Sequence, residues 1–451
     1  MIQKISFILF LGLALLAQPM WGQSPILAQY IEQGLEENLA LKRQDLSYRQ
    51  SEQALRAAKG LFYPQVQLIA NYTLAGGGRT LDFPVGDLLN PVYATLNQLT
   101  ETQQFPTNIE NVNEQFLPNN FQETKVRVIQ PLFNPDIYFN QQIEKAQLSM
   151  SAAQREAYRR SLIRDLQTAY FGYLQSEEVL RIYEETGGLL RQLLRTNQSL
   201  VANDKATPEV VSQAELQISQ WQSDRAGAEQ QRHTAQAYFN FLLNRPLEED
   251  ILVDSSLQAG LNPLSLEAWQ GRGQAGRIEL EQVKYAQEAT LGAVSLQRWR
   301  SLPTLSLVVD AGFQGFGYEF SEQEFILGQV ALTWNLFSGF QRQAQLEQVR
   351  LQSQSLNLQE QELQQQINFQ VQRAYDQVQQ AQAQLSAAEQ GLKHAQLSYR
   401  LLERKYQESQ ANWLELTQAR TDFTQAQIQR AIARYALMTS QAELSFAVGD
   451  F

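Results

Sequence analysis

The chain has 451 residues, with 47 acidic against 36 basic side chains and a formal net charge of −11. A moderately acidic chain without a basic stripe does not suit a nucleic-acid-binding protein, because its side chains do not neutralise phosphates. Cysteine is absent from the sequence. Disulfide bonds, thiolate metal sites, cysteine nucleophiles and a lipid anchor on cysteine are therefore excluded.

The N-terminus has the pattern of a secretory signal peptide. Lys4 precedes the apolar run FILFLGLALLA, and the small residue Gly22 follows. Such a run is too short for a membrane-spanning helix. We therefore predict that residues 1–22 are a signal peptide. An N-terminal membrane anchor is the alternative. Beyond this segment the sequence has no stretch of about 18 apolar residues.

Residues 23–63 have the spacing of apolar residues that is typical of a helix, and Pro64 ends this pattern. Apolar and polar residues then alternate for ten residues, which predicts a strand with one apolar and one polar face. Residues 79–123 are rich in asparagine and proline, and we predict a long loop there before a second strand. Residues 64–135 thus read as a β-hairpin. Its loop is expected outside the cell, where it would plug or cap a channel.

A long polar helical hairpin is predicted for residues 136–246. No proline interrupts the first helix, which would be about 100 Å long, and its apolar residues follow a coiled-coil-like seam. Gly187 and Gly188 are the one place where we predict this helix to be weak. Pro208 suits the first turn of the returning helix. This composition is typical of a coiled-coil rod, or of a wall with water on both sides.

The second half repeats this order. We predict a linker and second lead-in helix over residues 247–302, a second β-hairpin over 303–340 and a second helical hairpin over 341–451. Each strand has about ten residues, the length that a tilted strand needs to cross a bilayer.

Two offsets, 239 before the first loop and 204 or 205 after it, relate matching residues of the two halves. Pro303 follows Pro64 by 239 positions, whereas Phe337 follows Phe133 by 204 and Tyr375 follows Tyr170 by 205; Gln418 and Gln213 are again 205 apart. The register predicts an internal duplication, with about 35 extra residues in the first loop. Because four strands do not close around water, several copies are expected to assemble. An ordinary soluble sheet with one face on a core is the alternative.

The order of these parts resembles the TolC-like outer membrane efflux protein family, the outer membrane factors. The resemblance covers nearly the whole chain after the signal peptide. It rests on LFYPQVQL and its copy RSLPTLSL, on QPLF and its copy WNLF, and on the paired tyrosines Tyr170 and Tyr375. It implies a mainly α fold with a membrane β part. In that family a homotrimer forms a 12-stranded β-barrel continuous with a 12-helix periplasmic α-barrel.

The resemblance also implies a function. Such a protein is a passive exit duct of a tripartite efflux or type I secretion system, located in the outer membrane of a Gram-negative bacterium and extending into the periplasm. The implied partners are a periplasmic adaptor (membrane fusion) protein, an inner-membrane RND- or ABC-type pump and outer-membrane lipid, with no nucleic acid. We expect no enzymatic activity, no metal and no cofactor, because catalytic motifs are missing and His233 and His394 stand apart. A periplasmic coiled-coil adaptor or structural protein is the alternative.

The family closes its periplasmic end with acidic and tyrosine residues. Alignment of YQESQANWLELTQAR with that segment puts Tyr406 at the gate tyrosine and Glu415 at the first acid. Gln418 falls where a second acid is expected, and Ala411 where a basic partner is expected. Three copies of Glu415 around one aperture would repel each other and favour cations. Alternatively, Glu415 is an ordinary surface carboxylate and Tyr406 serves packing.

Adaptor docking in the family uses the tips of the helical hairpins. The resemblance therefore implies docking candidates at both tips, namely Ala206, Thr207, Pro208, Asn412 and Trp413. Trp413 has two alternative roles: it contacts an adaptor, or it is buried between neighbouring helices.

Overall fold

The structure is a computed structural model that describes residues 24–254, 257, 264–408 and 410–451. The predicted signal peptide, residues 1–22, lies outside the described residues. The chain divides into two compact units. The helical unit comprises the described parts of Met1–Glu52, Ala146–Glu288 and Ser353–Phe451, and the strand unit comprises Gln53–Lys145 and Ala289–Gln352.

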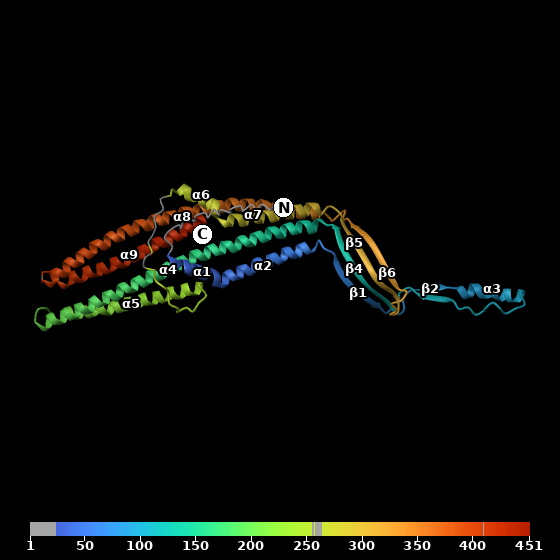
Figure 1. Cartoon of the computed structure of the whole chain (residues 1–451), viewed down its shortest axis with the longest axis horizontal. Coiled ribbons are helices and arrows are strands. Elements are labelled where there is room, and N and C mark those ends of the chain that lie inside the picture. The colour runs from blue at the N-terminus through green and yellow to red at the C-terminus, as the bar shows by residue number, and fades with distance from the viewer. Residues whose placement is uncertain (1–23, 255–256, 258–263, 409) are drawn as a thin grey trace, which may run out of the picture. The chain divides into compact units, whose positions relative to one another are not determined.

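The elements follow each other in the order that the sequence predicts, with additions in the first loop. They are α1 (Pro25–Glu37), α2 (Leu39–Gly60), β1 (Gln65–Thr73), β2 (Thr80–Phe83), α3 (Val85–Leu99), β3 (Val112–Gln115), β4 (Phe121–Phe133), α4 (Pro135–Ala202), α5 (Glu209–Leu242), α6 (Leu266–Gly276), α7 (Ile278–Trp299), β5 (Thr304–Phe316), β6 (Glu324–Thr333), α8 (Gln341–Gln407) and α9 (Trp413–Val448) (Figure 1). Among the described residues, no helix is both long enough and apolar enough to cross a membrane.

The internal duplication is confirmed and extends to the lead-in helices. Helix α7 begins and ends 239 positions after α2, and the hairpin of α8 and α9 repeats the hairpin of α4 and α5. The single lead-in helix predicted for residues 23–63 is instead two helices that meet at Asn38. The Asn38 side chain accepts hydrogen bonds from the backbone N–H groups of Ala40 and Leu41, both at 3.0 Å, and so caps α2.

The helical unit contains two apolar cores that are copies of each other. Each buried member of the second core lies 239 or 205 positions after a buried member of the first. The pairs are Tyr30 and Trp269, Leu162 and Ile367, Leu166 and Val371, Ala169 and Ala374, Phe239 and Leu444, Leu242 and Ala447, and Leu243 and Val448. Apolar burial is therefore repeated residue by residue.

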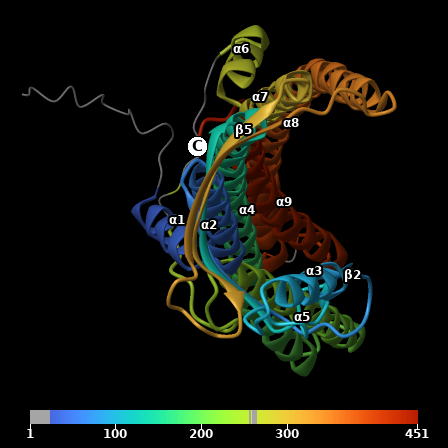
Figure 2. The same cartoon turned by 90° about the vertical axis from the view of Figure 1, so that its right-hand side faces the viewer.

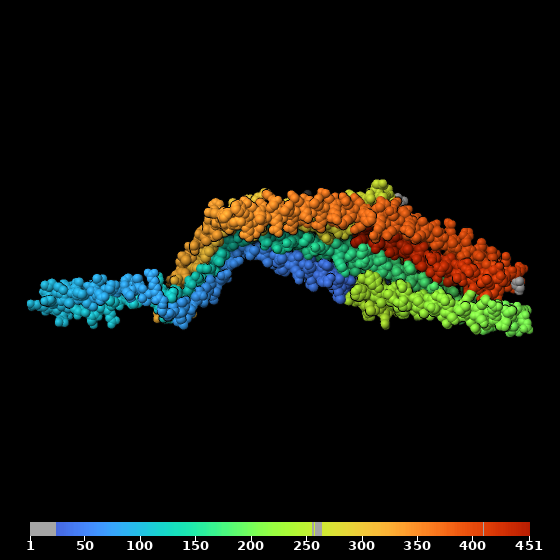
Figure 3. All heavy atoms as spheres, turned by 180° about the vertical axis from the view of Figure 1, so that it is seen from behind, coloured from blue at the N-terminus to red at the C-terminus, as the bar shows by residue number. Residues whose placement is uncertain are grey.

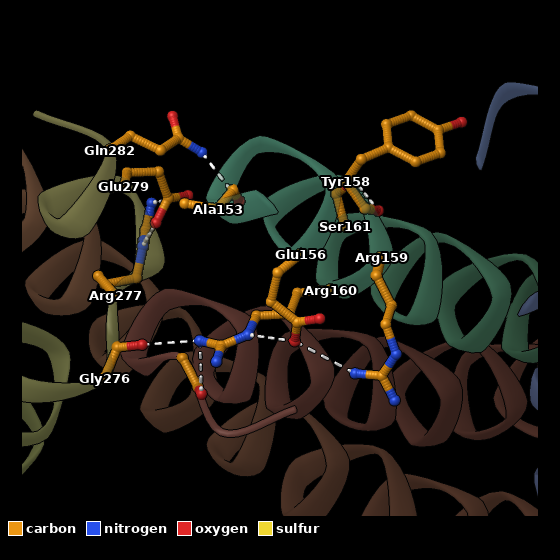
Figure 4. A network of polar contacts seen from close by, with 11 residues as sticks. Ala153, Glu156, Tyr158, Arg159, Arg160, Ser161, Gly276, Arg277, Glu279 and Gln282 are labelled. Carbon is orange, nitrogen blue, oxygen red and sulfur yellow. Dashed lines mark hydrogen bonds and ion pairs between the residues drawn. The ribbon is translucent and has the colours of Figure 1, made fainter. Parts of the chain in front are cut away.

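Both breaks between lead-in helices are tied to equivalent carbonyls. Asn38 Nδ2 donates to Leu242 O at 2.9 Å, and Arg277 Nη1 donates to Ala447 O at 3.2 Å. Arg277 also holds Glu279, with Nε to Oε2 at 2.8 Å. In the same network Arg160 Nη1 donates to Gly276 O at 2.7 Å (Figure 4). The first copy uses a neutral amide and the second a guanidinium for the same connection.

The strand unit contains a four-stranded antiparallel sheet in the order β1-β4-β5-β6. Gln67 lies opposite Arg127, and Arg127 lies opposite Asp310, so these three side chains share one face. The other face carries apolar residues of all four strands, including Leu68, Val126, Val309 and Val330. The two faces are those that the alternation predicts.

The prediction that residues 79–123 are loop-like is wrong. They contain the small β2–β3 sheet and helix α3, which lie next to each other in two views (Figures 1 and 2). Asn90 and Asn97 of α3 each make two hydrogen bonds to the backbone of the returning segment, at Ile109 and at Phe105. Asparagine, which suggests a loop in sequence, here replaces backbone pairing.

The helix is not interrupted at Gly187, since α4 continues through this residue. A Cβ at Gly187 would lie 2.2 Å from the Trp221 ring, so the absence of a side chain allows α5 to approach α4 closely. Trp221 Nε1 donates to Tyr183 O at 2.6 Å there. A Cβ at Gly188, by contrast, would meet nothing within 4 Å among the described residues.

These two glycines predict opposite effects of alanine. Gly188→Ala is expected to stabilise the helix by about 0.5–1 kcal/mol, because alanine has the higher helix propensity. Gly187→Ala is expected to destabilise the protein by about 1–3 kcal/mol, because the methyl group displaces Trp221. Thermal denaturation of both variants measures this. Equal shifts of the melting temperature would contradict the close approach at Gly187.

Candidate gate at the hairpin tips

A hydrogen bond joins the two helical hairpins close to their tips, which lie side by side (Figure 3). Tyr406 at the end of α8 donates through its hydroxyl to Asn197 Oδ1 of α4 at 3.1 Å. Asn197 is fully buried, and its Nδ2 donates to Val210 O of α5 at 3.1 Å. One asparagine side chain thus connects three helices.

Tyr406 is a neutral donor in this contact. Burial raises the pKa of its hydroxyl above the usual value, so the phenol keeps its proton at neutral pH. Its ring lies 6.3 Å from the Trp413 ring, centroid to centroid. Tyr406 therefore packs, as one of the two alternatives from the sequence expected, and also makes a specific polar link to α4.

Trp413 is buried within the chain, with 7% of its surface exposed. Of its two alternative roles, burial between helices is the one observed, and its ring is not available at the surface for docking. The exposed apolar side chain of this tip is its neighbour Leu414, at 72%. Sequence reasoning missed Leu414 because the helical phase at a helix start depends on where the cap lies.

Asn412 and Glu415 form a capping box at the start of α9. Asn412 Oδ1 accepts from the Glu415 N–H at 2.9 Å, and Glu415 Oε2 accepts from the Asn412 N–H at 3.0 Å. This satisfies two N–H groups of the first turn, where a carboxylate is also favoured by the helix dipole. Both side chains remain exposed, so the cap fixes the position of the Glu415 charge.

Gln418 also lies on the exposed face of α9, and its Nε2 donates to Asp422 Oδ1 at 2.8 Å. Asp422 lies two turns beyond Glu415 on the same side of the helix, because seven residues are nearly two turns. The second exposed acid of this face is thus Asp422 and not position 418. The seven-residue spacing was visible in the sequence and was overlooked.

Arg420 connects the hairpins deeper in the structure. Its guanidinium donates through Nη2 to Gln217 Oε1 of α5, and 5% of the residue is exposed. Burial lowers its pKa from the usual value. Nη1 has no hydrogen-bond partner in the described part of the chain. The alignment gave Ala411 as the position of a basic partner, whereas the buried cation that joins α9 to α5 is Arg420.

The first tip has a different construction. Thr207 and Pro208 are exposed and Ala206 is half-buried. Asp204 has a φ of 51°, and the Lys205 N–H donates to Leu200 O at 2.8 Å, which closes the end of α4. Pro208 directly precedes α5, as its fixed φ allows. These three candidates therefore lie in the short turn between α4 and α5.

Comparison with known proteins gives one family match. Residues 272–450, which cover most of the second copy, match the family model of the outer membrane efflux protein. No curated protein matches the chain by sequence similarity.

Solved structures match the chain over almost its full length. The Campylobacter jejuni CmeC outer membrane channel has a TM-score of 0.77 at 12% identity, covering 94% of this chain and 86% of that one. The Vibrio cholerae outer membrane protein VceC has 0.73 at 15%, with 94% and 96% covered. The open state of the Neisseria gonorrhoeae MtrE channel has 0.74 at 17%, with 94% and 89% covered.

The fold, over nearly the whole described chain, is that of outer-membrane channels. Residues 272–450 match the family model of the outer membrane efflux protein, which agrees with the resemblance that the sequence indicated.

The link at Tyr406 predicts a selective effect of removing one hydroxyl. Tyr406→Phe is expected to leave the buried Asn197 oxygen unsatisfied and to weaken tip closure by about 1–3 kcal/mol. Hydrogen exchange at residues 197–210 should then accelerate. The matched control is Tyr399→Phe, because the Tyr399 hydroxyl bonds within α8, to Glu403 Oε1 at 3.0 Å. Equal acceleration in both variants would contradict a link between the hairpins at Tyr406.

Proposed function

We propose that this protein is an outer-membrane exit duct of a tripartite efflux or type I secretion system. It passively conducts substrates that an inner-membrane pump delivers. The proposal rests on a combination of features in this one chain. The four-stranded sheet has an exposed apolar face, and no described strand pairs with the outer edges of β1 and β6. The same chain continues into two polar hairpins whose first helices, α4 and α8, are each about 100 Å long.

The apolar face of the sheet fits lipid. Leu68 of β1 is 74% exposed, and Ile326 and Val330 of β6 are 79% and 62% exposed. A row of exposed aliphatic side chains over several strands is rare on a surface that faces water. It is the pattern of transmembrane strands, which alternate apolar and polar residues.

Aromatic residues mark both ends of this face. Tyr72 lies on this face near the end of β1. Tyr318 follows the end of β5, and its ring lies 5.2 Å from the Tyr72 ring, centroid to centroid. Trp334, which directly follows β6, is exposed at the opposite end of this face. Aromatic girdles at the two membrane interfaces are typical of membrane-spanning sheets, so the sheet is proposed to cross the bilayer between these groups.

Three copies would satisfy the open edges. If β6 of one copy pairs with β1 of the next, three copies close a cylinder of twelve strands, which leaves no edge in the lipid. The duplicated hairpins would then give twelve helices in the periplasm. Closed rotational symmetry is the usual result of such head-to-tail contacts.

The proposed gate lies at the hairpin tips. The Tyr406–Asn197 link holds the tips together, and Glu415, Gln418 and Asp422 provide the polar face at the aperture. Docking of a periplasmic adaptor is proposed at the same end. Its candidate surface combines Thr207, Pro208 and half-buried Ala206 with Asn412 and Leu414, while Trp413 supports that surface from beneath.

The gate predicts a charge effect at Glu415. Glu415→Gln removes the negative charge but keeps an oxygen for the cap, since glutamine also serves at this position of a capping box. In the variant channel the ratio of cation to anion permeability is expected to fall roughly two- to fivefold, because the aperture loses three negative charges. Reversal potentials in a salt gradient measure this preference. An unchanged potential would contradict the placement of Glu415 at the aperture.

Membrane fractionation tests the proposed function itself. The protein is expected in the outer-membrane fraction, to require detergent for extraction, and to run as an oligomer on gels until heated. In the native strain, the solubilised protein should co-purify with an adaptor and an inner-membrane pump. Recovery as a soluble periplasmic monomer would refute the proposal and favour a periplasmic structural protein.

A further inference from the structure

We propose that Glu123, Lys125, Arg127 and Asp310 form a neutral charge quartet that prevents the membrane part of the pore from selecting ions by charge. This inference rests on the proposed function. It assigns to four residues of the strand unit a role in determining which solutes the membrane part admits.

The quartet contains nearly all the charge of the four-stranded sheet. Outside it, the only ionisable Asp, Glu, Lys or Arg side chain of these four strands is Glu324, at the first residue of β6. The quartet lies on one face, because Glu123, Lys125 and Arg127 alternate along β4 and Asp310 pairs with Arg127 in register. Glu324 pairs with Phe313, on the apolar face.

The four side chains are connected in a single network. Arg127 holds Asp310 with two bonds, Nε to Oδ1 at 2.8 Å and Nη2 to Oδ2 at 2.7 Å. Lys125 Nζ lies 3.5 Å from Asp310 Oδ2 and 2.5 Å from Glu123 Oε1. Two positive and two negative charges therefore compensate each other within one chain.

Burial makes this compensation necessary. The Asp310 side chain is 5% exposed and the Lys125 side chain 11%, so a partner lost at either would leave a poorly hydrated charge. The parts of the network that remain accessible are one cation, Arg127 at 34%, and one anion, Glu123 at 26%. A solute that passes the polar face therefore meets both signs at close range.

The rest of this face adds no charge. Its other polar members include Gln67, Asn71, Gln314 and Gln329, which are neutral. The fields of paired opposite charges cancel with distance, and salt screens the remainder beyond about 8 Å. The membrane part should thus pass cations and anions alike, and discrimination by charge is left to the acidic face of the hairpin tips.

Single substitutions that unbalance the quartet test this inference. Asp310→Asn adds one positive charge per chain and Arg127→Gln removes one. The reversal potential of the purified channel in planar bilayers under a KCl gradient is the readout. Asp310→Asn should shift the ratio of cation to anion permeability roughly two- to fivefold toward anions, and Arg127→Gln by a similar factor toward cations.

Two further variants serve as controls. The double variant Asp310→Asn/Arg127→Gln restores a net charge of zero and should return the potential to that of the unmodified protein. Glu324→Gln makes the same charge change as Asp310→Asn, but on the apolar face, and should not shift the potential. If Asp310→Asn fails to assemble, Glu123→Gln makes the same change at a more exposed position.

The outcomes separate the two proposals. Normal conductance with unchanged potentials in both single variants, or shifts of the same sign in both, would overturn the quartet while leaving the duct intact. Absence of any conductance from the correctly extracted, unmodified oligomer would instead refute the proposed function. Opposite shifts that cancel in the double variant would establish the quartet.

Discussion

The open outer edges of β1 and β6 are the constraint on which the rest of the structure depends. Backbone N–H and C=O groups along a strand edge need partners, and lipid offers none. The apolar face of the sheet excludes water as a substitute on that side. Because both edges belong to one four-stranded sheet, the proposed pairing between copies would satisfy them together. In that proposal, closure into a ring would give the sheet a polar interior.

The duplication shows how one chain builds the same packing twice without identical sequences. The two cores agree pair by pair, yet Asn38 and Arg277 make equivalent carbonyl contacts with different chemistry. Tyr170 illustrates the divergence: its hydroxyl donates to Leu252 O at 2.8 Å, in a segment between the two copies. Packing is thus conserved between the halves, while polar contacts differ. The hydrogen bond between Tyr406 and Asn197 at the tips is one of these polar contacts.

Much of the fold could be predicted because its signals are periodic. Alternation defined the strands, and long proline-free runs defined α4 and α8. Prediction was wrong where a side chain replaces backbone pairing, as Asn90 does beside α3, and where a glycine marks close approach rather than weakness, as at Gly187. The link between Tyr406 and Asn197 joins positions 209 residues apart, and no local pattern reports such a contact. Arg420 was missed because an arginine in a polar helix usually faces solvent.

Pairing of β1 with β6 between copies can be measured directly, since the chain has no native cysteine. Leu68→Cys would be combined in turn with Ile326→Cys, Val330→Cys and Leu332→Cys, all on the apolar face, and oxidised in membranes. Within one chain these edges are three strands apart, about 14 Å, which is beyond disulfide reach. For at least one cysteine pair, the account predicts disulfide-linked dimers and trimers on a non-reducing gel, no larger species, and their loss on reduction. Monomers alone for every pair would contradict it.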